Sequence, residues 1–135
     1  DYDFIALAQG TTTTSLGVLL SSSPNTEVWV FPVLKGFDSI QEMQTLAKKF
    51  DYEEEWNLNN HRLRVFSNYH FSGYGKGSHE VQQALNELQV TTDFDLDKVY
   101  TMKAFVGLLT ELNQQNNSLK GLFIHTGGVF SNGLF

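Results

Sequence analysis

Residues 4–20, FIALAQGTTTTSLGVLL, decide which class of fold this chain can adopt. Residues 4–10 form a short, continuous apolar run that ends in Gly10, which is typical of a strand buried on both faces of a parallel sheet. A polar threonine loop follows, and residues 15–23 then predict an apolar helix that stops at a serine-rich turn. The stretch therefore predicts a strand, a loop and a helix in that order.

The same alternation continues along the rest of the chain. Further strands are expected over residues 27–34, 63–71 and 119–128, and further helices over residues 39–50, from Ser78 onward and after Tyr100. Pro32, inside the second apolar run, indicates an edge strand, the end of pairing or a bulge. Strands that alternate with helices predict an α/β fold with a mainly parallel sheet and helices on both faces, and residues 1–135 show no second domain boundary.

Local signals mark the start and the end of the helix expected over residues 39–50. Ser39 and Glu42 have the spacing of a capping box, in which each side chain satisfies a backbone N–H group of the first helical turn. The acidic segment that follows, residues 51–56 (DYEEEW), is expected to form a solvated surface turn. Neither His61 nor His79 has a neighbouring ligand at metal-ligand spacing, and the acidic segment is interpreted as a solvated face, so no metal site is predicted.

Composition excludes several classes of function. The formal net charge is −6, and the nine basic residues are scattered, which argues against a nucleic-acid partner or an anionic membrane surface. Cysteine is absent, so the chain has no disulfide, no thiolate nucleophile and no cysteine metal site. The apolar runs are too short to span a membrane. A cytoplasmic protein is expected.

The threonine run GTTTTS, residues 10–15, allows two interpretations. The amino terminus of a helix has backbone N–H groups without intrahelical partners and about half a positive charge, so hydroxyl residues there suit a phosphate or a carboxylate. Threonine and serine are also common helix caps, and the run can simply be solvated. It is not a P-loop, because no Gly-Lys-Ser/Thr sequence follows.

Five segments, taken in order, resemble the C-terminal half of a family of pyridoxal-phosphate enzymes. They are GTTTTSLG at residues 10–17, VLKG at residues 33–36, NYHFSGYGK at residues 68–76, DKVYTMKAFVGL at residues 97–108 and FIHTGGVFSNGLF at residues 123–135. The family includes 1-aminocyclopropane-1-carboxylate deaminase and D-cysteine desulfhydrase, and it shares the fold of the tryptophan synthase β-subunit. The resemblance covers nearly the whole chain.

The resemblance implies a binding role for the threonine loop. In the family, a glycine-rich loop at this place holds the phosphate of the cofactor, pyridoxal 5'-phosphate, with backbone N–H groups. The matching residues here are Gly10, Thr11, Thr12, Thr13 and Thr14. Thr12 and Thr13 stand where the family typically has glycine, and their Cβ atoms are expected to restrict the turn.

The resemblance also assigns four residues nearer the substrate. Tyr74 and Tyr100 match the two active-site tyrosines, and Thr126 matches the residue that hydrogen-bonds the pyridine nitrogen of the cofactor. Thr101 stands near that nitrogen, where the deaminases carry glutamate, and in this respect the chain is more similar to the desulfhydrases.

The lysine that holds the cofactor in this family lies in the N-terminal half, and none of the seven lysines here matches its motif. The resemblance therefore implies that residues 1–135 are the C-terminal part of the cofactor-binding domain, with the N-terminal half as a partner and a homodimer as the assembly. It implies a deaminase or desulfhydrase that releases ammonia and a 2-oxo acid from a small amino acid. The alternative is a non-catalytic or degenerate α/β module that binds an anionic small molecule.

Overall fold

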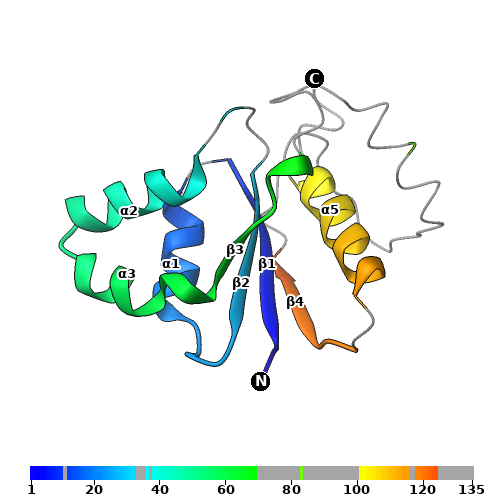
Figure 1. The fold of residues 1–135 in the computed structure, drawn as a ribbon, viewed down its shortest axis with the longest axis horizontal. Helices are drawn as coiled ribbons and strands as arrows, with labels where there is room; N and C mark the ends of the chain where they lie inside the picture. The colour runs from blue at the N-terminus through cyan, green and yellow to red at the C-terminus, as the bar shows by residue number, and fades with distance from the viewer. Residues whose placement is uncertain are drawn as a thin grey trace, which may run out of the picture.

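A computed structural model describes residues 1–10, 12–32, 36, 38–69, 83, 101–115 and 118–124. The helix expected from Ser78 lies outside these residues apart from Gln83, which is helical. The elements are β1 (Phe4–Gln9), α1 (Thr13–Ser21), β2 (Glu27–Pro32), α2 (Ser39–Lys49), α3 (Glu53–Asn59), β3 (Leu63–Val65), α5 (Thr101–Gln114) and β4 (Gly121–Ile124), with short 3-10 turns at Asn60–Arg62 and Ser67–Tyr69 (Figure 1).

The described strands form one parallel sheet in the order β3-β2-β1-β4. Phe4 at the start of β1 is aligned with Glu27 of β2 on one side and with Gly121 of β4 on the other. Pro32 is aligned with Gln9 at the end of the β1–β2 ladder, so of its three possible roles it marks the end of pairing. The predicted α/β class with a mainly parallel sheet is confirmed.

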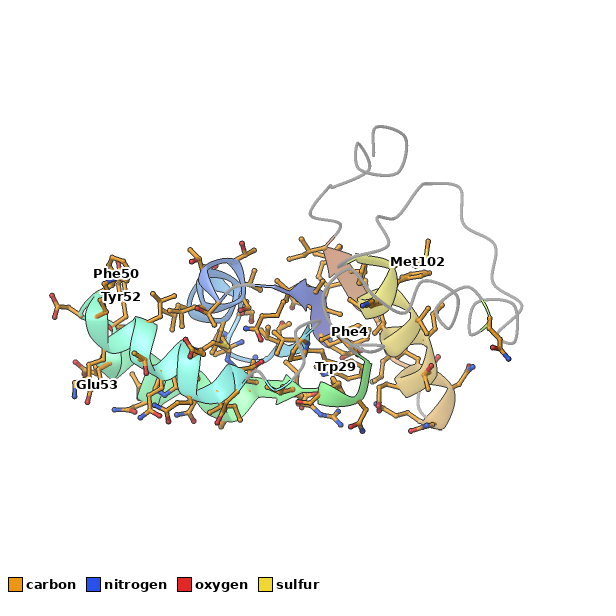
Figure 2. The ribbon with its side chains drawn as sticks, turned by 90° about the horizontal axis from the view of Figure 1, so that it is seen from above. Phe4, Trp29, Phe50, Tyr52, Glu53 and Met102 are labelled. Atoms are coloured by element: carbon orange, nitrogen blue, oxygen red, sulfur yellow. The ribbon has the colours of Figure 1, made fainter. Side chains whose placement is uncertain are left out.

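Helices cover both faces of the sheet, as predicted. Alternate side chains of β2 point to opposite sides: Val28 and Val30 pack with α1, α2 and α3, whereas Trp29 and Phe31 pack with α5. Figure 2 looks onto the carboxyl edge of the strands and shows α1 and α5 on opposite sides of them. This alternation explains why β2 is a continuous apolar run in the sequence, since both of its faces are buried.

Three local predictions differ from the structure at the helices. The N-cap of α2 is Asp38, whose carboxylate accepts a hydrogen bond from the backbone N–H of Gln41 at 3.1 Å, so the predicted capping box of Ser39 and Glu42 is wrong by one residue. The acidic segment is not a turn but the start of α3, because its glutamates favour the positive end of the helix and Trp56 anchors it in the core. Helix α1 begins at Thr13, two residues earlier than predicted.

Two predicted strands are shorter than their apolar patterns. β3 ends at Val65, and the chain turns into a 3-10 helix at Ser67–Tyr69 where the sequence predicted a strand to residue 71. β4 covers Gly121–Ile124, and residues 125–128 of that predicted strand lie outside the described residues. At β3 the pattern of apolar residues continues past the last residue that pairs with a neighbouring strand, and at β4 the strand begins two residues later than predicted.

Gly121 offers a direct test of the packing between β4 and β1. A Cβ atom at this position would overlap the ring of Phe4, which is 3% exposed and stacks on Trp29 with 4.2 Å between ring centroids. Because that ring has no free space to enter, Gly121→Ala should lower the free energy of unfolding by about 1–3 kcal/mol, as overpacked cores do. Denaturant unfolding followed by tryptophan fluorescence measures the change.

Gly17 provides the matched control for this prediction. A Cβ atom there would meet nothing within 4 Å, and the residue lies inside α1. Gly17→Ala should therefore raise the free energy of unfolding by about 0.5–1 kcal/mol, because alanine favours the helix. Equal effects of the two substitutions would show that Gly121 is not packed against Phe4 as described.

Candidate functional site

The carboxyl ends of β1 and β4 mark the place where the sheet changes its winding direction. From β1 the chain proceeds through α1 to β2 and then to β3 on one side, whereas α5 crosses the opposite face and returns to β4 on the other side of β1 (Figure 1). In open parallel sheets, ligands bind in the crevice outside the carboxyl ends of two strands at such a switch point. Gly10 directly follows β1, and Thr12–Thr14 form the N-cap and the start of α1, so these residues lie at this edge of the sheet.

Among the described residues no side chain caps the amino terminus of α1, and in this sense we call this helix end open. Its N-cap, Thr12, has φ −92° and ψ −12° and makes no side-chain capping hydrogen bond, and the first turn contains no acidic residue. The backbone N–H groups of the first turn have no acceptor within the helix, and the helix dipole adds partial positive charge there. This end of α1 therefore has the donors and the charge that an anion requires.

The backbone at Thr12 is in the right-handed helical region, which any L-residue adopts. Thr12 and Thr13 need no glycine conformation, because Thr13 is already the first residue of α1. The expectation that their Cβ atoms restrict the turn relative to the family's glycine loop stays a prediction. Thr13 and Thr14 are exposed at the start of the helix, and Thr13 also lines a hollow with Leu16 of α1 and Leu46 of α2.

A buried polar contact connects β1 to this helix end. Gln9, the last residue of β1, is 1% exposed, and its Nε2 donates to Oγ of Ser15 at 2.5 Å. The Ser15 hydroxyl in turn donates to the carbonyl oxygen of Thr12 at 3.1 Å. The sequence interpretation missed both residues. The available signal was a single glutamine at the end of an otherwise apolar strand.

The structure describes only part of the predicted site. Gly10 is a half-buried bend after β1, Thr12 is half-buried, and Thr101 is the first residue of α5, of which only the backbone is described. Thr11, Tyr74, Tyr100 and Thr126 lie outside the described residues, so their roles stay predictions.

A hollow of about 430 Å³ lies at the amino terminus of α2 and is lined by Asp38, Ser39 and Ser67 among others. Its size does not make it an anion site, because the Asp38 carboxylate already accepts from the backbone N–H of Gln41 and would repel a phosphate. Charge thus favours the amino terminus of α1 over that of α2 as an anion site.

The described part of the chain contains neither a metal-binding cluster nor a membrane-spanning helix. Among its residues there is no group of three or more histidine, aspartate or glutamate side chains placed to hold a metal ion. None of the helices described there combines the length and the apolar character that crossing a membrane requires.

Curated proteins similar to this chain carry one name. A putative 1-aminocyclopropane-1-carboxylate deaminase of Pyrococcus furiosus is 30% identical over 134 residues, which is 96% of this chain and 40% of that protein. A protein of the same name from Thermotoga maritima is 39% identical over 84 residues, covering 61% of this chain and 26% of that protein. The chain thus spans at most about two fifths of these relatives. No family model matches it.

The fold agrees with these relatives. A crystal structure described as that of an ACC deaminase homologue superposes with a TM-score of 0.66 at 29% identity, over 95% of this chain and 40% of that chain. The similarity therefore extends over nearly all of the present residues in both sequence and structure. The chain belongs to the family of 1-aminocyclopropane-1-carboxylate deaminase-like proteins and corresponds to about 40% of their length.

Proposed function

We propose that this chain supplies the phosphate-binding part of an enzyme that uses pyridoxal 5'-phosphate and acts on small amino acids. The observation that carries the proposal is the open amino terminus of α1, which lies at the switch point of a parallel sheet. The relatives named as putative deaminases support the same class of enzyme.

The described residues fit a phosphate group. Backbone N–H groups of Thr13, Thr14 and Ser15 are donors at the positive end of a helix, and no acidic residue lies in that turn. Thr13 and Thr14 are both exposed in that turn. The phosphate would thus be held by neutral donors and the helix dipole, and binding would need no lysine or arginine from this segment.

The cofactor, when bound, supplies an electron sink for charge that develops at an amino-acid carbon. The role of the described residues is to hold its phosphate and so fix where its ring lies. Tyr74 and Tyr100 are proposed to face the substrate, and Thr101 and Thr126 to lie near the ring nitrogen. The lysine that carries the cofactor is expected outside residues 1–135.

The substrate and the assembly are part of the same proposal. The substrate would be of the 1-aminocyclopropane-1-carboxylate or D-cysteine class, and the products would include ammonia and a 2-oxo acid. The N-terminal half of the enzyme would be the partner of this chain, in a homodimer located in the cytoplasm.

Ligands with and without a phosphate test the proposal. Pyridoxal 5'-phosphate and pyridoxal share the same pyridine ring, and pyridoxine 5'-phosphate and pyridoxine, which have no aldehyde, form a second pair that differs only in the phosphate. Equilibrium dialysis should show that the phosphorylated compound of each pair binds at least about tenfold more tightly, because the helix end contributes only to that compound. Equal affinities would contradict the proposal.

In the complete gene product, an absorbance band near the visible edge that borohydride removes would mark a cofactor held by lysine. Tight binding of the phosphorylated compound without such a band would instead support the non-catalytic module.

A further inference from the structure

Gln9 and Ser15 link the end of β1 to the carbonyl group that closes the first turn of α1. The carbonyl oxygen of Thr12 accepts from the Ser15 hydroxyl at 3.1 Å and from the backbone N–H of Leu16 at 2.9 Å. Because the single hydroxyl proton of Ser15 is used on Thr12, its oxygen is free to accept from Nε2 of Gln9, which lies 2.5 Å away. In this arrangement each of the two hydrogen bonds has one donor and one acceptor.

A contribution to stability does not explain why position 9 is occupied by glutamine. Its other amide atom, Oε1, is buried and has no hydrogen-bond partner among the residues that the structure describes. A buried acceptor without a partner costs free energy, and an apolar side chain of the same length would avoid that cost. The unpartnered oxygen belongs to the same planar amide group whose nitrogen contacts Ser15, so it lies at the first turn of α1. A destabilising residue at this place points to a role in the site.

The geometry of the peptide bond shows what that role is. In a trans peptide the C=O and N–H groups lie in one plane and point in opposite directions. The carbonyl of Thr12 shares its peptide plane with the N–H group of Thr13. Two donors that fix this carbonyl along the helix therefore also fix the Thr13 N–H group, which must point out of the open end.

We propose that Gln9 is a positioning residue for the anion site. Through Ser15 it holds the Thr12–Thr13 peptide so that the first N–H groups of α1 converge on the phosphate. The inference rests on the proposed function, because it takes a phosphate at this helix end as given. The inference extends the proposed function by naming Gln9, a residue of the sheet and not of the loop, as the one that orients the N–H donors.

Gln9→Met tests the inference, since methionine has a similar length and makes no amide hydrogen bond. The affinity for pyridoxal 5'-phosphate should fall about five- to tenfold, as expected for the loss of one ordering hydrogen bond. The melting temperature should stay the same or rise, because the unpartnered acceptor is removed with the amide. A merely structural role predicts the reverse: lower melting temperature and unchanged affinity.

Two further variants complete the experiment. Ser15→Ala should lower the affinity by a similar factor, and the double variant should bind no more weakly than either single variant, because both remove the same link. Thr26→Val is the matched control: Oγ1 of Thr26 makes a buried bond of 2.9 Å to the carbonyl of Tyr2 at the opposite edge of the sheet. This variant should leave the affinity unchanged.

The outcomes are distinguishable. If the unsubstituted protein does not prefer pyridoxal 5'-phosphate to pyridoxal, the proposed function itself is wrong and the inference falls with it. If it does prefer the phosphate and both Gln9→Met and Ser15→Ala retain that preference in full, only the inference is overturned. If Gln9→Met fails to fold, Ser15→Ala alone decides, because it removes a single oxygen atom from a small side chain.

Discussion

Replacing Arg62 by alanine should lower the free energy of unfolding by about 3–5 kcal/mol, because two or more buried acceptors would lose their donor at once. The guanidinium is 4% exposed and donates to the carbonyls of Leu19 and Thr26 at 2.6 Å each. Its other acceptors are Ser22 Oγ at 3.0 Å, Ser23 O at 2.9 Å and Asn59 Oδ1 at 2.8 Å.

Through these hydrogen bonds Arg62 joins α1, the start of β2 and α3. All of the acceptors are neutral, and burial lowers the pKa of the guanidinium from its ordinary value because the charged group has lost water. The carbonyl of Leu19 lies in the last turn of α1, where the helix dipole is negative and stabilises a cation. The carboxyl end of α1 is thus closed by an internal cation, whereas its amino end is left open.

Thermal unfolding followed by circular dichroism measures the effect, and we expect the melting temperature to fall by about 10–15 °C for a chain of this size. Arg64→Ala is the matched control. Arg64 lies two residues away, its side chain is 42% exposed, and its ion pair with Glu27 is 3.7 Å long. Surface pairs contribute little, so this variant should lose about 1 kcal/mol. Equal losses for the two variants would show that the buried guanidinium does not hold these elements together.

Replacing Thr13 by glutamate should lower the affinity for pyridoxal 5'-phosphate by more than about 100-fold. Thr13 is the exposed first residue of α1, so a carboxylate there would lie beside the proposed phosphate. Two unit charges about 4 Å apart repel by roughly 4 kcal/mol near a protein surface, which is ample for a 100-fold loss. The carboxylate would also occupy the positive end of the helix in place of the ligand.

The same substitution should not damage the fold. A glutamate in the first turn of a helix is stabilising by about 0.3–1 kcal/mol, so the melting temperature should be equal to or above that of the unsubstituted protein. Thr45→Glu, at an exposed position of α2, adds the same charge outside the first turn of α1 and should leave the affinity within about twofold. If Thr13→Glu binds the phosphorylated ligand as tightly as Thr45→Glu does, the phosphate does not bind at α1.

The class of fold follows from the sequence because burial in a parallel sheet leaves a strong pattern. The continuous apolar runs at β1 and β2 predict strands covered on both faces, and the structure confirms this by placing α5 opposite α1. The order β3-β2-β1-β4 has no comparable local signal, since it depends on which faces the connecting helices cover. Only the strand order shows where the switch point lies. It therefore also shows that the threonine loop begins at a place where ligands bind in such sheets.

Three features could not be predicted because they depend on backbone geometry or on contacts between elements, and not on neighbouring residues in the sequence. Ser39 and Asp38 are both good helix caps, and only the backbone geometry decides between them. Thr13 and Thr14 look like loop residues by propensity, but the core contacts of Leu16 and Leu19 extend the helix to include them. The contact between Gln9 and Ser15 joins a strand to a helix across a loop, and no pattern within either element predicts it.

The most direct test of the central claim is a titration with inorganic phosphate followed by amide NMR spectroscopy. If the open end of α1 is the anion site, the amide signals of Thr13, Thr14 and Ser15 should shift together and saturate, whereas the amide of Gln41, already bonded to Asp38, should not move. Sodium chloride at the same ionic strength should produce no such shifts. A response at the start of α2, or none at the start of α1, would contradict the account.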